Sequence, residues 1–387
     1  MPYPEITEPL PGPKAFELTG DVAWFSQAAV LLGLGLQLSG ALEPAPVDLA
    51  KGGIAPEEDL LPRDDVERLQ LPSLTGRGGQ FDIQNLQRKL LERYGKVMGK
   101  EASPEDQQEK LSEVLSDLAR RLYKDPNPRA AAELFEASLR SPSPLVRVAA
   151  AASYLVQSTE RPRLLRILAQ GAESSDELVR DLAATVLARV DPQNEVLRRL
   201  TERKVGAHGS AAGADTTLLV HGTWGRSAEW WRPGGDFHTY IRTSVFPDLY
   251  SLPDRFDWTG GYSDPARGQG AQDLLAWVTQ HNEQGLNLIT HSHGGNISML
   301  ATHAGLQIGK LILLSCPVHF PKYEPDFPRI KNAVSVRVHF DLVILADRGH
   351  QRFRHARIRE VILPIWFNHS ATHEQQVWIQ HNVSSMI

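Results

Sequence analysis

The chain has 387 residues, more than one hydrophobic core usually organises, so two or three domains are expected. Its 41% hydrophobic and 22% charged residues are typical of a globular protein and exclude a disordered or fibrous chain. The net charge of -5 gives no electrostatic reason to expect a nucleic-acid partner. The single cysteine, Cys316, excludes an intramolecular disulfide framework and favours a cytoplasmic location.

One long stretch without charge covers residues 22–42 and is just long enough to span a bilayer. Two glutamines, Gln27 and Gln37, interrupt it, and the residues before it are mainly acidic. A secretory signal would need a basic segment and a small-residue cleavage site, and neither is present. We therefore expect a helix that is buried or faces a partner, with contact to a membrane or lipid as the alternative.

The N-terminal region, residues 1–105, is expected to combine helical and irregular segments. Residues 84–98 have the apolar spacing of an amphipathic helix, whereas residues 43–79 are rich in Pro, Gly and Asp and are expected to be loop-like. Residues 106–204 are expected to form a helical domain that begins with an amphipathic helix at 106–124.

An internal repeat lies within this helical domain. SPSPLVRVAAA at 141–151 is echoed by SSDELVRDLAA at 174–184, an offset of 33 residues. Each copy starts with polar residues that can cap a helix, and each is followed by a further helical segment, at 163–169 or 194–200. The pattern resembles HEAT-type α-hairpins, with a generic helical bundle as the alternative. We expect this domain to bind a protein partner or to gate substrate access, without catalysis.

A change in composition marks the domain boundary. All 14 histidines lie at His208 or later, and Trp24 is the only tryptophan before that point. Residues 205–215 are small and Gly-rich, as expected of a linker. Within 216–387, short apolar runs alternate with helix-like segments, which predicts a mainly parallel sheet flanked by helices. The expected strands are 216–220, 286–290, 310–315, 335–340 and 361–365, with a further short one at 255–258.

The second of these strands runs into THSHGG, residues 290–295, and then into a helical stretch. A strand, a sharp turn and a helix are what a nucleophile elbow requires, with the serine, Ser292, at its tip. Gly294 allows the strand and the helix to approach each other closely, whereas Thr290 stands where a glycine is common. The first strand also ends in a glycine-containing turn, His221 to Trp224.

A serine hydroxyl becomes a good nucleophile only when a base takes its proton, and the base needs a carboxylate to hold its tautomer. The candidate acid is Asp341, which follows the strand at 335–340, with Asp347 as the alternative. The candidate base is His369, which follows the last strand, with His373 as the alternative.

With these motifs in this order, residues 216–387 resemble a compact member of the α/β-hydrolase family, of the lipase and esterase kind. The resemblance implies a Ser292, Asp341 and His369 triad. It also implies an oxyanion hole formed by the backbone N–H groups of Thr223 and His293, with Trp224 as the alternative to Thr223. The FDWTGGYS segment at 256–263 resembles a block of such enzymes, whereas the family's first two strands are missing.

The implied function is hydrolysis of a carboxylic ester, of a small molecule or a lipid, through an acyl-enzyme. A thioesterase, amidase or acyltransferase, and a non-enzymatic interaction protein on a hydrolase scaffold, are the alternatives. No cofactor is expected. No metal is expected either, because the pairs His291 with His293 and His369 with His373 lack a third ligand at zinc-site spacing. The aromatic residues at 230–240 and the segment 317–328 are each expected to line a pocket or to pack a loop.

Overall fold

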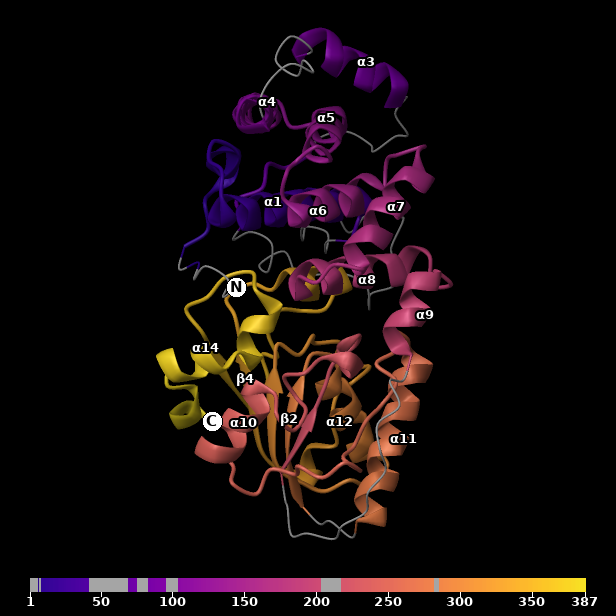
Figure 1. Cartoon of the computed structure of the whole chain (residues 1–387), viewed down its shortest axis with the longest axis vertical. Coiled ribbons are helices and arrows are strands. Elements are labelled where there is room, and N and C mark those ends of the chain that lie inside the picture. The colour runs from indigo at the N-terminus through magenta and orange to yellow at the C-terminus, as the bar shows by residue number, and fades with distance from the viewer. Residues whose placement is uncertain are drawn as a thin grey trace. The chain divides into compact units, whose positions relative to one another are not determined.

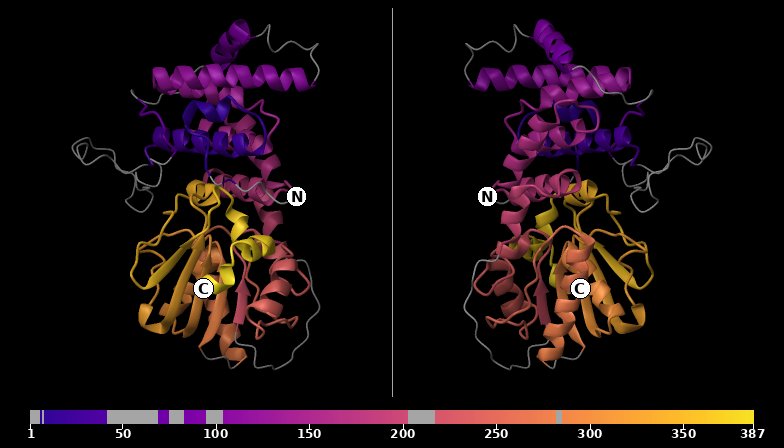
Figure 2. Two further views of the ribbon diagram at one scale, coloured as in Figure 1. Left: turned by 90° about the vertical axis from the view of Figure 1, so that its left-hand side faces the viewer. Right: turned by 90° about the vertical axis from the view of Figure 1, so that its right-hand side faces the viewer.

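The computed structural model describes residues 6, 8–41, 69–74, 83–94, 104–202, 217–281 and 285–387. The chain forms two compact units, Met1–Pro192 and Gln193–Ile387 (Figures 1 and 2). The expected linker, residues 205–215, lies outside the described residues, as does most of the loop-like segment 43–79. The division falls before that linker, so the last helix expected in the helical domain belongs to the second unit.

Every element described in the first unit is a helix, and its described residues include no strand. Its elements in chain order are η1 (Gly12–Phe16), α1 (Asp21–Ser39), α3 (Ile83–Tyr94), α4 (Pro104–Lys124), α5 (Pro128–Ser138), α6 (Pro144–Tyr154), α7 (Arg161–Ala172) and α8 (Glu177–Val190).

Helix α1 corresponds to the uncharged stretch and packs against α6 within this unit. The Ser153 hydroxyl on α6 donates to the Leu31 carbonyl at 2.8 Å, and a Cβ on Gly35 would lie only 2.7 Å from Ser153. The small residue therefore lets the two helices approach closely. Among the described residues, α1 is long and apolar enough to cross a membrane. However, 72% of its most apolar stretch of 18 residues is buried inside the protein. The arrangement favours a core helix.

The two copies of the repeat begin equivalent helices, α6 and α8. The side chains of Ser143 and Asp176 accept hydrogen bonds from the backbone N–H groups of Val146 and Val179, respectively. Both caps satisfy an N–H group that the first helical turn leaves without a partner. The repeated polar start and LVR sequence therefore mark the same structural position twice.

The second unit contains a sheet of five parallel strands in the order β1-β2-β3-β4-β5. The strands are β1 (Thr217–Val220), β2 (Leu286–His291), β3 (Ile308–Leu314), β4 (Ile330–Arg337) and β5 (Ile358–Ile362). Each of the five principal strands expected from the sequence is present, although the last three begin earlier than expected. The expected strand at 255–258 is wrong, because this segment is irregular and Leu249 instead bridges to Thr217 at the outer edge of β1.

Helices cover both faces of the sheet because successive side chains of each strand point to opposite faces. Leu218 packs with α11 (Asp264–Gln280) and α12 (His293–His303), whereas Leu219 packs with α10 (Asp236–Ser244) and α14 (Gln375–Gln380). Figure 1 shows these helices around the strands. The remaining elements of this unit are α9 (Glu195–Thr201), η3 (Gly225–Ser227), η4 (Phe327–Arg329), α13 (Leu342–Asp347), η5 (His369–His373) and η6 (Val383–Met386).

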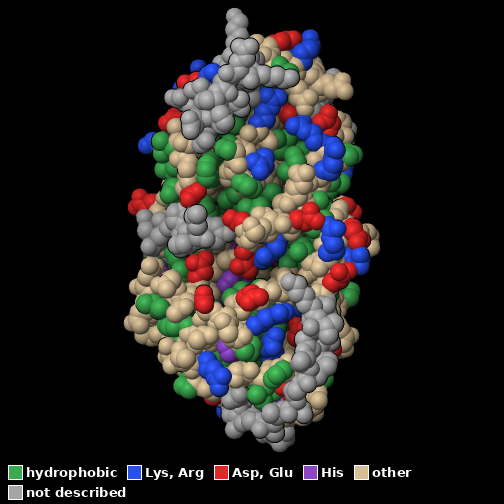
Figure 3. Space-filling view, viewed as in Figure 1, with side chains coloured by type: hydrophobic (Ala, Val, Ile, Leu, Met, Phe, Trp, Pro, Cys, Tyr) green, Lys and Arg blue, Asp and Glu red, His purple; other side chains and the backbone are tan. Residues whose placement is uncertain are grey.

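All five strands run in the same direction, so the segments that follow them meet at one edge of the sheet. This edge therefore receives the turn after β1, the elbow after β2 and the segments after β3, β4 and β5. On the face drawn in Figure 3, basic and acidic side chains are both spread over the surface, whereas histidines show only as small areas.

Candidate active site

Ser292 joins β2 to α12 and has the strained backbone of a nucleophile elbow. Its φ and ψ are 52° and -132°, a region that residues with a side chain rarely adopt. Its N–H donates to the Leu314 carbonyl at 2.8 Å, which fixes the tip of the turn against the end of β3. The serine is only 6% exposed.

Two glycines allow this turn to pack against the end of β1. A Cβ on Gly222 would lie 2.7 Å from the Ser292 Cβ, and one on Gly294 would lie 2.7 Å from the Val220 carbonyl oxygen. Thr290, which stands where a glycine is common, is fully buried, and its hydroxyl donates to the Ile312 carbonyl at 3.1 Å. The threonine hydroxyl thus has a hydrogen-bond partner behind the elbow.

Asp341 and His369 form a buried hydrogen-bonded pair at the same edge. The distance from His369 Nδ1 to Asp341 Oδ2 is 2.7 Å, and both side chains are 2% exposed. The other carboxylate oxygen of Asp341 accepts from the backbone N–H groups of Val343 and Ile344, at the N-terminus of α13. This cap fixes the carboxylate, which in turn accepts from Nδ1 of the imidazole and so sets its tautomer.

The two alternatives from the sequence are placed differently. Asp347 lies at the end of α13 and pairs with other histidines, as described below. His373 is stacked on Trp230 with ring centroids 4.3 Å apart. His369 lies beside the elbow, because its carbonyl oxygen is 3.4 Å from Nε2 of His291, the residue before Ser292. The structure therefore brings Asp341 and His369 together, whereas Asp347 and His373 contact other side chains.

The His291 ring packs against the rings of His369 and His373. Its pKa is held well below the usual range by burial and then by repulsion from His373 and His369, so its imidazole stays neutral. Its ring lies 4.7 Å from that of His369 and 4.4 Å from that of His373. A neutral ring here fills the space behind the candidate base without adding a charge.

The turn after β1 is held by several hydrogen bonds. The His221 carbonyl accepts from Trp258 Nε1 at 2.8 Å, and His221 Nε2 lies 3.3 Å from an oxygen of Asp257. The Trp224 N–H donates to the Gly260 carbonyl at 3.0 Å, so it is already used within the protein. Of the two N–H groups named from the sequence at this turn, only that of Thr223 stays a candidate oxyanion donor.

The aromatic residues after this turn pack in the core of the second unit. Trp231 and Phe237 are each 1% exposed and contact the face of the sheet that α10 and α14 cover. Trp231 Nε1 also donates to the Gly225 carbonyl at 2.9 Å. The sequence left open whether this segment lines a pocket or packs a loop. The burial of Trp231 and Phe237 fits the packing of a loop.

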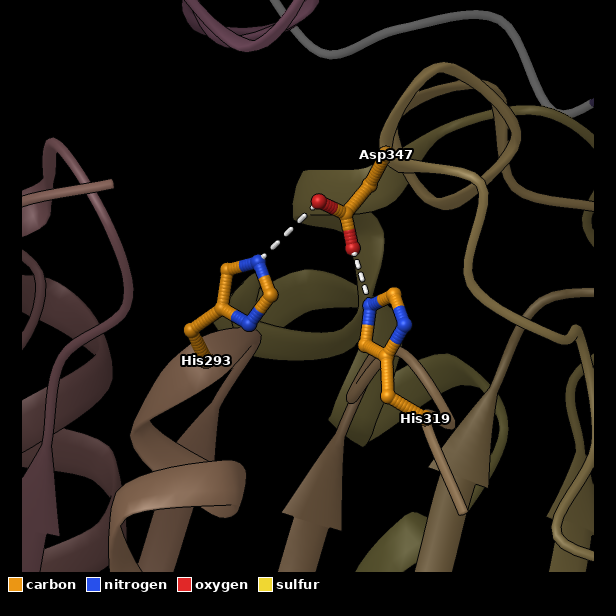
Figure 4. Close-up of side chains that lie close together, drawn as sticks. All are labelled: His293, His319 and Asp347. Carbon is orange, nitrogen blue, oxygen red and sulfur yellow. Dashed lines mark hydrogen bonds and ion pairs between the residues drawn. The ribbon is translucent and has the colours of Figure 1, made fainter. Parts of the chain in front are cut away.

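A second cluster of titratable side chains lies beside the elbow (Figure 4). Asp347 accepts from His319 Nε2 at 2.7 Å and lies 3.3 Å from His293 Nε2, and it also accepts from the Tyr262 hydroxyl. Burial alone would raise the pKa of Asp347, but its interactions with His293 and His319 outweigh burial and hold the pKa well below the usual range. The carboxylate is therefore ionised.

Arg267 supplies the positive charge of this cluster. Its Nη2 donates to His293 Nε2 at 2.8 Å, and its guanidinium lies over the rings of Tyr262 and Tyr323. Burial, and then the charge of Arg267, lowers the pKa of His293 to about 4. The cluster therefore contains a cationic guanidinium, an anionic carboxylate and two imidazoles. The imidazole of His293 is neutral.

Two imidazole nitrogens and a carboxylate, those of His293, His319 and Asp347, lie close enough to hold a metal ion. The lone pair of His293 that a metal would need already accepts from Arg267, so a metal would have to displace a buried guanidinium. This trio differs from the histidine pairs considered from the sequence. His319 was missed because nothing in its sequence spacing separates it from an ordinary loop residue.

The second unit is thus a parallel α/β unit with a buried Asp–His pair and a strained serine at one sheet edge. No protein-family model and no curated protein matches the chain. Among solved structures, the chain is similar to an uncharacterized protein from Bacillus cereus ATCC 10987, with 11% identity over 79% of this chain and 98% of that chain. The TM-score of 0.27 is too low to indicate a shared fold.

Proposed function

We propose that the second unit is a serine hydrolase of the α/β-hydrolase type that cleaves carboxylic esters. The observation that carries this proposal is the 2.7 Å hydrogen bond between buried Asp341 and His369, placed beside the strained elbow of Ser292. Nothing in the stability of a strand-to-helix turn requires a serine with a positive φ. The combination is what an activated serine needs.

In the proposed reaction, Ser292 Oγ attacks the ester carbonyl carbon while His369 Nε2 takes the hydroxyl proton. The resulting oxyanion accepts hydrogen bonds from the N–H groups of Thr223 and His293. His293 is the first residue of α12, where the backbone N–H has no intrahelical partner. His369 then gives its proton to the leaving alcohol, and water hydrolyses the acyl-enzyme by the same steps.

The second cluster supports both halves of this oxyanion hole. Arg267 holds the His293 side chain, and the Tyr262 ring stacks on Trp224, the neighbour of Thr223, with centroids 6.3 Å apart. Asp347 lies between these two sides because it accepts from Tyr262 and one of its oxygens is 3.3 Å from His293 Nε2. In our proposal the cluster positions the two donors without touching the substrate.

Labelling by a fluorophosphonate probe tests the nucleophile. We expect the wild-type chain to be labelled and Ser292→Ala to be unlabelled, with turnover of a p-nitrophenyl ester lowered by roughly a million-fold. Ser244→Ala, an exposed serine at the end of α10, is the matched control and should be labelled as the wild type is. An unlabelled wild type, or equal labelling of Ser292→Ala, would reject the proposal.

The reaction class is tested with matched substrates. We expect p-nitrophenyl esters of increasing acyl length to be hydrolysed faster than the corresponding amides and thioesters. Faster turnover of the amide or thioester would reassign the enzyme to the amidases or thioesterases.

We further propose that the helical first unit binds a protein partner or gates access of a small-molecule or lipid ester, and that the chain works in the cytoplasm without a cofactor.

A further inference from the structure

The first unit contains a cavity of about 460 Å³ between α3, α4 and α5. Its volume lies within the range of small-molecule sites, roughly 300 to 1,000 Å³. Basic side chains dominate its lining, which has Lys89, Arg93, Arg121, Lys124 and Arg129 against Asp125 and Glu133. Five cations and two anions leave an excess of three positive charges, in a protein whose net charge is -5.

The two carboxylates of the lining already interact with other groups. Glu133 lies 3.4 Å from Arg121 Nη2 and 3.5 Å from Arg129 Nε, so one acid is shared between two arginines. Asp125 accepts from the Asn127 side-chain amide at 3.3 Å. These interactions leave most of the positive charge of the cavity uncompensated.

One of the arginines that line the cavity has a buried donor without an acceptor. Nη1 of Arg121 is shielded from solvent and has no hydrogen-bond partner among the described residues. Buried guanidinium N–H groups are normally paired, because leaving one unpaired costs free energy. In addition, α5 begins at the cavity with Asn127 as its cap, and a helix N-terminus favours negative charge.

We propose that this cavity binds an organic polyanion with two or more phosphate groups, either as a free metabolite or as the headgroup of a lipid. Phosphate oxygens match the planar fork of arginine, and the cavity contains Arg93, Arg121 and Arg129. A cavity of this volume suits a compact headgroup better than an extended acidic peptide. The site belongs to the first unit and does not depend on the function of Ser292.

Calorimetric titration of the full chain tests the proposal with pyrophosphate and inositol hexakisphosphate as probes. We expect saturable binding that weakens as salt rises, because phosphate contacts are screened. Lys89→Gln and Lys124→Gln should each weaken binding about two- to fivefold, as expected for loss of one partly exposed ion pair. Lys110→Gln on α4, outside the cavity lining, is the matched control and should bind as the wild type does.

Sedimentation with vesicles separates the two sources of phosphate. Binding to vesicles with a polyphosphorylated lipid, but not to neutral vesicles, indicates a lipid headgroup, whereas binding of the free probes alone indicates a metabolite. Both results support the site if the two cavity variants weaken them. No saturable binding of either probe, equal loss in Lys110→Gln, or tighter binding of a poly-glutamate peptide would overturn the proposal.

Discussion

His293 combines two tasks in the proposed site. In our proposal its backbone N–H donates to the oxyanion, while its side chain accepts from the guanidinium of Arg267. A charged imidazole would repel Arg267 and could no longer accept that hydrogen bond. The low pKa of His293 keeps its imidazole neutral, and the hydrogen bond from Arg267 requires a neutral imidazole. The same low pKa makes the stability of the unit depend on pH.

The pH dependence of folding tests this link. The unfolded chain has a histidine pKa of about 6.5, whereas His293 titrates at about 4 when folded, so between these values the unfolded state binds more protons. Stability therefore falls as pH falls through this window. We expect His293 alone to lower the unfolding free energy by about 2 kcal/mol between pH 7.5 and pH 5.

Urea unfolding of the wild type and of two variants at both pH values measures this effect. His293→Gln should lose this part of the pH dependence, whereas His303→Gln, an exposed histidine on the same helix, should retain it. A wild type that is as stable at pH 5 as at pH 7.5 would show that His293 is not held neutral.

The two acids at the sheet edge are distinguished by their amide variants. Asp341→Asn should lower kcat by roughly 10,000-fold, because an amide stabilises the wrong tautomer of His369 and cannot stabilise its charged form. Asp347→Asn should lower kcat by up to about 100-fold, through a shift of the oxyanion donors, with KM little changed. Steady-state kinetics on one p-nitrophenyl ester compares them. A larger loss of kcat in Asp347→Asn than in Asp341→Asn would show that Asp347 is the catalytic acid and that our assignment of Asp341 is wrong.

At the scale of the elements, the turn after β1 and the elbow after β2 depend on contact through Gly222. A methyl group there would lie 2.7 Å from the Ser292 Cβ and 2.9 Å from the His291 carbonyl oxygen. We expect Gly222→Ala to destabilise the unit by about 1 to 3 kcal/mol and to lower activity, because the turn must move away from the serine.

Gly268→Ala is the matched control for this substitution. A Cβ on Gly268 would meet no atom within 4 Å, and the residue lies inside α11, so alanine should stabilise the unit by about 0.5 to 1 kcal/mol. Thermal unfolding and esterase rates of both variants measure the contrast. Equal stability of the two variants would show that the turn does not pack on the elbow as described.

The sheet could be predicted because its strands are short apolar runs that end in polar or glycine-rich turns. Asp341 and His369 could be placed because each follows such a strand, and all strand ends share one edge. The Asp347 cluster could not be predicted, because it unites residues from four separate segments whose spacing has no pattern. Residues 255–258 were misplaced because alternating apolar residues also suit a buried irregular segment, in which Phe256 and Trp258 are 3% and 1% exposed.

For the whole molecule, the position of the division determines which fragment can fold. Helix α9 belongs to the second unit, where it contacts η3, and the Thr201 carbonyl accepts from Arg226 Nη1 at 3.4 Å. Arg226 also binds Asp257, which lies beside the turn after β1. Helix α9 thus supports, through Arg226, the turn that contains Thr223. Composition alone had assigned this helix to the helical domain.

Two truncations test this assignment. We expect residues 193–387 to fold alone and to hydrolyse a short p-nitrophenyl ester at the rate of the full chain, because the three residues of the proposed triad lie within them. Residues 205–387 lack α9 and should be less stable by at least about 1 kcal/mol, from the lost hydrogen bond to Arg226 and the lost contact with η3. Urea unfolding compares the stability of the two fragments. Equal stability would show that α9 is not part of the second unit. If residues 193–387 also match the full chain on long-chain esters, the first unit does not gate the site, and its role must lie in binding.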